Sequence, residues 1–134
     1  MQERLPTLAI RWLPALGMMA VIFGFSSIPA AEMPHFDWAD FLVKKGGHMT
    51  GYALLALGFW HGLGWAPRRR GLAWLLAVLF AVTDEFHQSF VPGRNPSWVD
   101  VVVFDALGAA LGLVIRARIQ AVREQLGAAA RHKG

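Results

Sequence analysis

The sequence has no cysteine and little charge: only 16% of its 134 residues are Asp, Glu, Lys or Arg. Without cysteine there is no disulfide framework, thiolate nucleophile or cysteine metal site. The G-x-S-x-G elbow, the P-loop and the dinucleotide fingerprint are also absent. Because 55% of the residues are hydrophobic, a soluble domain of this length would lack the polar residues to cover its surface. We predict one membrane domain covering residues 1–134.

Four apolar runs predict an all-α fold, a four-helix transmembrane bundle. A helix needs roughly 20 apolar residues to cross the hydrocarbon of a bilayer, and each run approaches that length with its flanking residues. The first run leaves a cleaved signal peptide open as an alternative, because small residues follow it at Ala30 and Ala31. The predicted helices cover about residues 12–28, 41–63, 71–90 and 98–115, followed by a cytoplasmic tail at 116–134. This tail could extend the last helix for a few turns before fraying near Gly127.

The distribution of basic residues predicts the orientation of this bundle. Ten of the thirteen fall at the N-terminus, in the turn between the second and third helices, and in the tail. These segments lie on one side of a four-helix topology, so the positive-inside rule places both termini in the cytoplasm. The basic residues form no stripe interleaved with exposed aromatics, which argues against nucleic acid as a partner. They are Arg4, Arg11, Arg68, Arg69, Arg70, Arg116, Arg118, Arg123, Arg131 and Lys133.

Polar side chains gather in the outer half of three predicted helices. In the second helix, Lys45, His48 and Tyr52 share one face through their i, i+3 and i+7 spacing. Charged groups inside membrane-length segments are costly and mark functional sites by default. The other members of this predicted site are Asp84, Glu85 and Gln88 in the third helix, Arg94 in the turn after it, and Asp100 and Asp105 in the fourth helix.

Less specific interpretations of these residues remain open. Lys45 and Arg94 could neutralise Asp84, Glu85 or Asp100 in a purely structural network, with Arg94 acting as a helix cap. A divalent metal among the histidines and acids is another alternative. No H-E-x-x-H or paired-histidine pattern is present, so we predict no metal and no cofactor.

Two further patterns concern packing. Gly108 and Gly112 form a small-xxx-small face, which favours close approach of a neighbouring helix in lipid. Trp60 and Trp65 flank the turn between the second and third helices, where they fit an aromatic belt at the membrane interface.

The pattern K-x-x-H-x-x-x-Y followed by D-E-x-x-Q-x-x-x-P-x-R resembles the VanZ-like family of small bacterial membrane proteins. The resemblance extends over roughly residues 21–113, and the family is typified by a protein linked to teicoplanin resistance. Two positions depart from the family pattern: Asp105 stands where Asn is usual, and Gly51 where many members carry Glu. The motif positions are Lys45, His48, Tyr52, Asp84, Glu85, Gln88, Pro92, Arg94 and Asp100.

From these residues we hypothesise that the protein acts in the bacterial cytoplasmic membrane. Its polar side chains would form a cleft on the extracytoplasmic side. The cleft would bind an anionic lipid or a lipid-linked cell-wall headgroup, and a glycopeptide antibiotic is a further partner. Lys45, Arg94 and Asp105 would contact this ligand. Acid–base chemistry would use Asp84 or Glu85, with His48 relaying a proton and Gln88, Tyr52 and Asp100 orienting the groups. The alternative is a non-catalytic protein that alters glycopeptide access to the surface.

Overall fold

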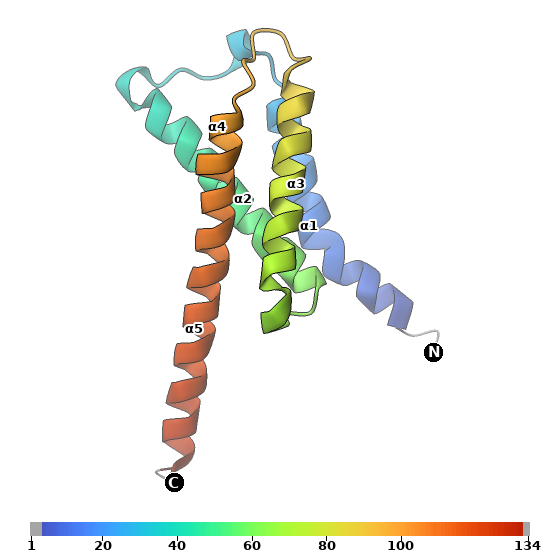
Figure 1. Cartoon of the computed structure of the whole chain (residues 1–134), viewed down its shortest axis with the longest axis vertical. Coiled ribbons are helices and arrows are strands. Elements are labelled where there is room, and N and C mark those ends of the chain that lie inside the picture. Colours follow the sequence, from blue (N-terminus) through green and yellow to red (C-terminus); the bar gives the residue numbers. More distant parts are fainter. Residues whose placement is uncertain (1–3, 133–134) are drawn as a thin grey trace.

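The computed structural model describes the backbone of residues 4–132 and the side chains of residues 7–132. Lys133, counted above among the cytoplasmic basic residues, lies outside this range. The described chain is all-helical with four long helices, as predicted (Figure 1). They are α1 (Arg4–Ser26), α2 (Asp40–Gly62), α3 (Arg70–Gln88) and a helix composed of α4 (Trp98–Asp100), a π-helical segment (Val101–Asp105) and α5 (Ala106–His132). Short 3-10 turns occupy Ala30–Glu32, Asp37–Ala39 and Pro67–Arg69.

The predicted bounds of α2 and α3 are correct to within two residues, whereas α1 and α5 are longer than predicted. Helix α1 begins at Arg4 rather than near residue 12, because a proline in the first turn of a helix removes no required hydrogen bond. The segment predicted as a tail continues as helix to His132. Its Ala, Arg, Gln and Glu residues are strong helix formers, and a single Gly127 does not end it.

Two of these helices are long and apolar enough to cross a bilayer. They are Thr7–Ser26 of α1 and the continuous helix Trp98–His132. Much of their apolar surface faces outward, including Leu13 and Phe25 on α1 and Val102 and Leu111 on the last helix. Within the described chain, α2 and α3 do not meet the same combination of length and hydropathy.

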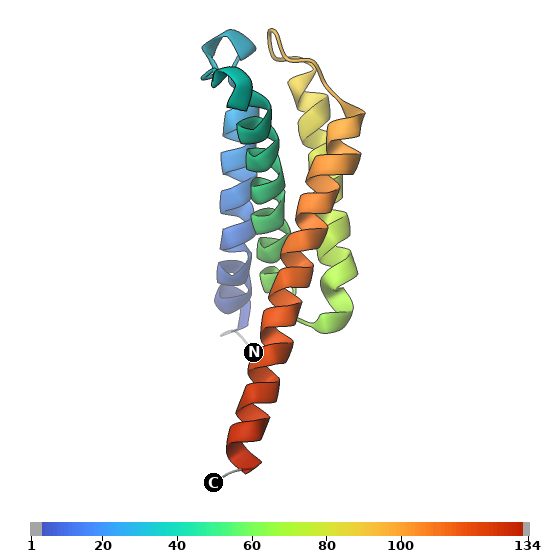
Figure 2. The same cartoon turned by 90° about the vertical axis from the view of Figure 1, so that its left-hand side faces the viewer.

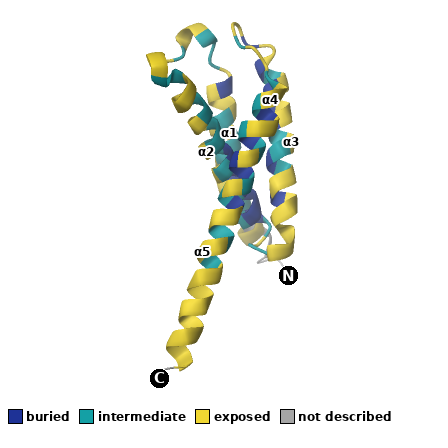
Figure 3. Cartoon of the chain, turned by 60° about the vertical axis from the view of Figure 1, so that its left-hand side comes forward, coloured by how far each residue is buried: buried dark blue, intermediate teal, exposed yellow. Residues whose placement is uncertain are grey.

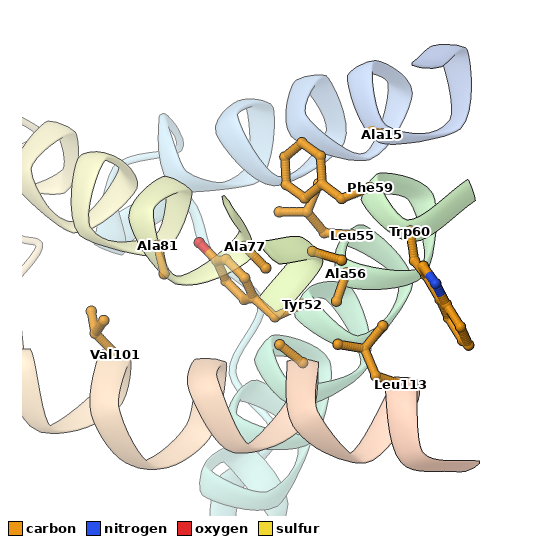
Figure 4. Packing of buried hydrophobic residues seen from close by; sticks show 12 residues of the cluster. Ala15, Tyr52, Leu55, Ala56, Phe59, Trp60, Ala77, Ala81, Val101 and Leu113 are labelled. Atoms are coloured by element: carbon orange, nitrogen blue, oxygen red, sulfur yellow. The ribbon is translucent and has the colours of Figure 1, made fainter. Parts of the chain in front are cut away.

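The core is built around α2, which packs against α1, α3 and α5. Buried residues concentrate along the middle of the bundle (Figure 3). Tyr52 and Leu55 of α2 lie at its centre (Figure 4), surrounded mainly by small side chains from the other helices. Because small side chains let helix backbones approach closely, the bundle is narrow. The buried alanines are Ala15, Ala56, Ala73, Ala77, Ala81 and Ala109.

Glycines mark the closest contacts of α2 with its neighbours. A Cβ atom at Gly58 would lie 2.9 Å from the Ala15 backbone of α1. On α5, a Cβ atom at Gly108 would lie 2.4 Å from the carbonyl oxygen of Met49, and one at Gly112 would lie 2.9 Å from Ala53. The small-xxx-small face of α5 therefore packs directly on α2, as its spacing predicts.

The prediction that Trp60 belongs to an interfacial belt is wrong. Its side chain is 1% exposed, and its Nε1–H donates to the carbonyl oxygen of Ala66 at 2.9 Å. The turn after α2 folds back over the indole, so the hydrophobic body is buried and the one polar atom is satisfied.

The arrangement of the helices distinguishes two ends of the bundle. One end, here called the loop end, carries the connections 27–39 and 89–97. Helix α1 begins and α5 ends toward the opposite end, where α2 also turns into α3 (Figures 1 and 2). Toward the loop end, α2 diverges from α1 and α3 (Figure 1). This divergence creates the space that holds the candidate site.

Helix α5 extends beyond the rest of the bundle (Figure 2). Its residues 121–132 are all exposed (Figure 3). A chain ending at residue 120 should therefore change the free energy of unfolding by less than about 0.5 kcal/mol, as expected for surface changes. Thermal unfolding in detergent checks this. A chain ending at Gly112 provides the contrast, because it removes the buried Leu113 and should unfold at a clearly lower temperature.

Candidate functional site

A cavity of about 860 Å³ lies between the loop-end halves of α1 and α2 and the end of α3. One wall is apolar and comes mainly from α1, including Met18, Ile22 and Phe25. The other wall is polar and contains seven of the nine residues predicted for the site. The remaining two, Asp84 and Asp105, are each 2% exposed and do not line the cavity. The seven lining residues are Lys45, His48, Tyr52, Glu85, Gln88, Arg94 and Asp100.

Two polar pairs join α2 to the last helix. Lys45 forms an ion pair with Asp100. One helical turn further along α2, His48 Nδ1 lies 3.1 Å from Asp105 Oδ1. The spacing of the pairs differs between the helices, since the basic partners are three residues apart and the acidic partners five.

The π-helical segment Val101–Asp105 reconciles these spacings. The N–H of Ala106 donates to the carbonyl oxygen of Val101, five residues earlier. Residues five apart lie about 140° apart around an α-helix, but stack near one another where the helix adopts the wider π turn. The segment therefore presents both Asp100 and Asp105 to α2. The π-helical segment was not predicted, although two acids at i, i+5 opposite a K-x-x-H face indicate it.

A second polar cluster joins α1 to α3. Asp84 Oδ2 accepts hydrogen bonds from Ser26 Oγ at 2.6 Å and from Gln88 Nε2 at 3.0 Å. All three side chains are buried. Ser26 was not predicted as a site residue, even though it is a polar residue at the end of an apolar run. The acids at 84 and 85, adjacent in sequence, thus face different partners.

Two buried polar atoms have no hydrogen-bond partner among the described side chains: Tyr52 Oη and Asp84 Oδ1. The hydroxyl of Tyr52 is directed toward α3 (Figure 4). Buried polar groups are nearly always satisfied in native structures. A polar group entering the cavity beside Tyr52, which lines it, would find hydrogen-bonding capacity there.

Glu85 connects the end of α3 to the start of the last helix. Its Oε1 accepts the backbone N–H of Ser97, the residue before α4. No cation pairs with Glu85 within residues 7–132. The side chain is 4% exposed, so a negative charge on this carboxylate would lie in a sheltered place without an ion-pair partner.

Arg94 serves as a cap for α1. Its Nε donates to the carbonyl oxygen of Ile28 at 3.0 Å, and its Nη2 donates to that of Phe25 at 2.9 Å. Cations are favourable near the carbonyl end of a helix. The capping alternative is therefore correct, whereas Asp100, its other suggested partner, pairs with Lys45 instead. A guanidinium has five N–H donors, and these two bonds leave three.

The remaining charges sit at the rim or apart from the cavity. Lys44 lies 2.7 Å from Asp40, and this hydrogen bond at the start of α2 lowers the pKa of Asp40 below its usual value. His87 stacks on Phe23 and lies 3.0 Å from Ser27 Oγ, so it is not grouped with His48. Among the described side chains, no three His, Asp or Glu residues gather in a metal-binding arrangement.

Comparison with known proteins gives one result. A family model described as VanZ/LLP1 matches residues 11–120. This range contains most of α1 and all of α2, α3 and the cavity-lining residues. No curated protein and no solved structure matches the chain.

Proposed function

Because the chain belongs to the VanZ-like family, we propose that it is an integral membrane protein of the bacterial cell envelope that binds the anionic group of a lipid or of a lipid-linked cell-wall headgroup. The family and the two apolar helices indicate a membrane protein. In our proposal all four helices cross the cytoplasmic membrane, with the loop end and its cavity on the extracytoplasmic side. Membership of the family supports an association with glycopeptide resistance.

The distribution of basic residues between the two ends of the bundle supports this orientation. The described basic residues at the end opposite the loops include Arg11, Arg68 and Arg116, whereas Lys45 and Arg94 lie toward the loop end. Basic residues are in excess on the cytoplasmic side of membrane proteins. The cavity would then be level with the outer leaflet and its headgroups.

The observation that carries the proposal is the two-sided character of the cavity. Its apolar wall on α1 suits a hydrocarbon chain, and its polar wall on α2 and α3 suits a headgroup. Arg94 brings unused N–H donors to this wall, and a guanidinium matches the geometry of phosphate or carboxylate oxygens. An amphiphilic ligand fits both walls at once.

The structure also favours a second candidate, binding without catalysis. Lys45 and His48 are already engaged by Asp100 and Asp105. Pairs of this kind can hold a binding site rigid without taking part in a reaction. In this alternative the protein shields a surface group and changes how glycopeptides reach it.

A test of binding compares lipids that copurify with the full-length protein. Native protein and an Arg123→Ala control should retain a phosphate-bearing lipid, while Arg94→Ala should retain about tenfold less, the effect of losing a charge-assisted hydrogen bond. Thermal unfolding of each variant separates this effect from the loss of the α1 cap. Equal retention by Arg94→Ala would contradict the proposed role of Arg94.

A second measurement distinguishes chemistry from binding alone. Lipid and cell-wall precursor profiles are compared between cells producing native protein, Glu85→Gln, or the exposed control Glu124→Gln. A modifying activity predicts that the native profile changes relative to cells without the protein, and that Glu85→Gln abolishes the change. Identical profiles at equal expression would remove the enzymatic version and leave the binding version.

A further inference from the structure

We propose that the ligand of this cavity is a zwitterionic amphiphile, with a phosphate held by Arg94 and an ammonium held by Glu85. This inference rests on the proposed lipid-binding function and specifies the class of headgroup. It goes beyond an anionic ligand, because it requires a positive group on the ligand as well.

The first step of the argument is the balance of charge around the cavity. Apart from His48, which pairs with Asp105, three basic and three acidic residues line it. Lys44 pairs with Asp40, and Lys45 pairs with Asp100. Glu85 and Arg94 are the two left over, and neither has an ionic partner among the described side chains. One negative and one positive group are thus available to a ligand, and complementary charge determines which ligand is preferred.

The second step is the unused bonding capacity of these two groups. A carboxylate offers about four acceptor positions, and Glu85 uses one of them for the N–H of Ser97. Its burial makes an unneutralised charge costly, and a ligand ammonium would offset that cost. Arg94 retains N–H donors after capping α1 and can bind phosphate oxygens.

The third step is the apolar wall. Met18, Val21, Ile22 and Phe25 of α1 face the cavity. The volume of about 860 Å³ lies within the range of small-molecule sites. A headgroup with the first part of a hydrocarbon chain satisfies both walls, whereas a free zwitterion would leave the α1 wall without a partner.

The test uses full-length protein in detergent and three lipids with the same acyl chains. The first is phosphatidylethanolamine, and the second is the same lipid with an acetylated amine, which removes the ammonium but keeps the phosphate. The third is phosphatidylglycerol. Native protein should bind phosphatidylethanolamine about tenfold more tightly than either of the other two, the effect of one charge-assisted hydrogen bond.

Variants then test whether Glu85 is the residue that binds the ammonium of the ligand. Glu85→Gln keeps an oxygen for the N–H of Ser97 but removes the charge, so it should bind the free and acetylated lipids equally. The control Glu124→Gln, on the exposed part of α5, should keep the tenfold preference. If Glu85→Gln keeps the preference as well, Glu85 is not the ammonium partner and the inference is overturned.

Comparison of the lipids on native protein does not depend on how any variant folds. Equal binding of phosphatidylethanolamine and its acetylated form would overturn the inference and leave the proposed function standing. Tighter binding of phosphatidylglycerol would do the same. Failure to bind any of the three would overturn the inference together with the phospholipid form of the proposed function, and would leave only the lipid-linked cell-wall headgroup as its ligand.

Discussion

Replacing Gly108 with alanine is expected to destabilise the bundle by about 3 kcal/mol, at the upper end of the usual cost of overpacking. The new Cβ atom would lie 2.4 Å from the carbonyl oxygen and 2.6 Å from the Cα atom of Met49. These are backbone atoms of α2, so no side chain can turn aside. The helices must separate, and the contacts of the last helix with α2 weaken along its length.

Thermal unfolding of the purified protein in detergent measures this effect. Gly17→Ala is the matched control, because nothing lies within 4 Å of the position of its Cβ atom. Alanine is the better helix former by roughly 1 kcal/mol, so the control should be unchanged or slightly more stable. An unfolding temperature of Gly108→Ala equal to that of native protein would show that α2 and α5 do not meet at this point.

Inserting an alanine after Val102 is expected to remove the Lys45–Asp100 ion pair while preserving a continuous helix. Val102 lies in the π-helical segment and is 70% exposed, so the added residue enters outside the core. One π turn accommodates only one extra residue, so a second rotates Asp100 by about 100° relative to the α5 residues. The expected cost is about 2 kcal/mol, the contribution of a hydrogen bond between charged groups.

A double-mutant cycle identifies the cause of that cost. Lys45→Met should destabilise the native protein, since it leaves Asp100 unpaired, but should have little further effect in the insertion variant. Inserting an alanine after Ala128, in the exposed part of α5, is a control that lengthens the helix without changing the pair. Equal effects of Lys45→Met in both backgrounds would mean that the π segment does not position Asp100.

The sequence was sufficient to predict the all-helical fold, the bounds of α2 and α3, and the face shared by Lys45, His48 and Tyr52. These features depend on local periodicity, since apolar runs and i, i+3 spacing are properties of a single helix. The start of α1 and the end of α5 were misjudged because hydropathy was used to set their limits. Helix formation follows propensity and capping as well.

The partners of the polar residues were harder to predict because they depend on how the helices are rotated in the bundle. Lys45 could have faced several acids, and only the packing of α2 against the last helix selects Asp100. Arg94 faces the end of α1, which is 66 residues away from it in sequence. The contribution of Ser26 likewise depends on the contact between α1 and α3.

The length of the last helix converts a small tilt near the cavity into a larger displacement at its far end. Its 35 residues from Trp98 to His132 make a rod of roughly 52 Å at 1.5 Å per residue, well beyond the ~30 Å of bilayer hydrocarbon. A tilt of about 5° at the loop end moves the far end of such a rod by roughly 4.5 Å. The displacement of a spin label near Arg131 would therefore report small movements of the helix segment that carries Asp100 and Asp105. The label itself would not contact the residues that line the cavity.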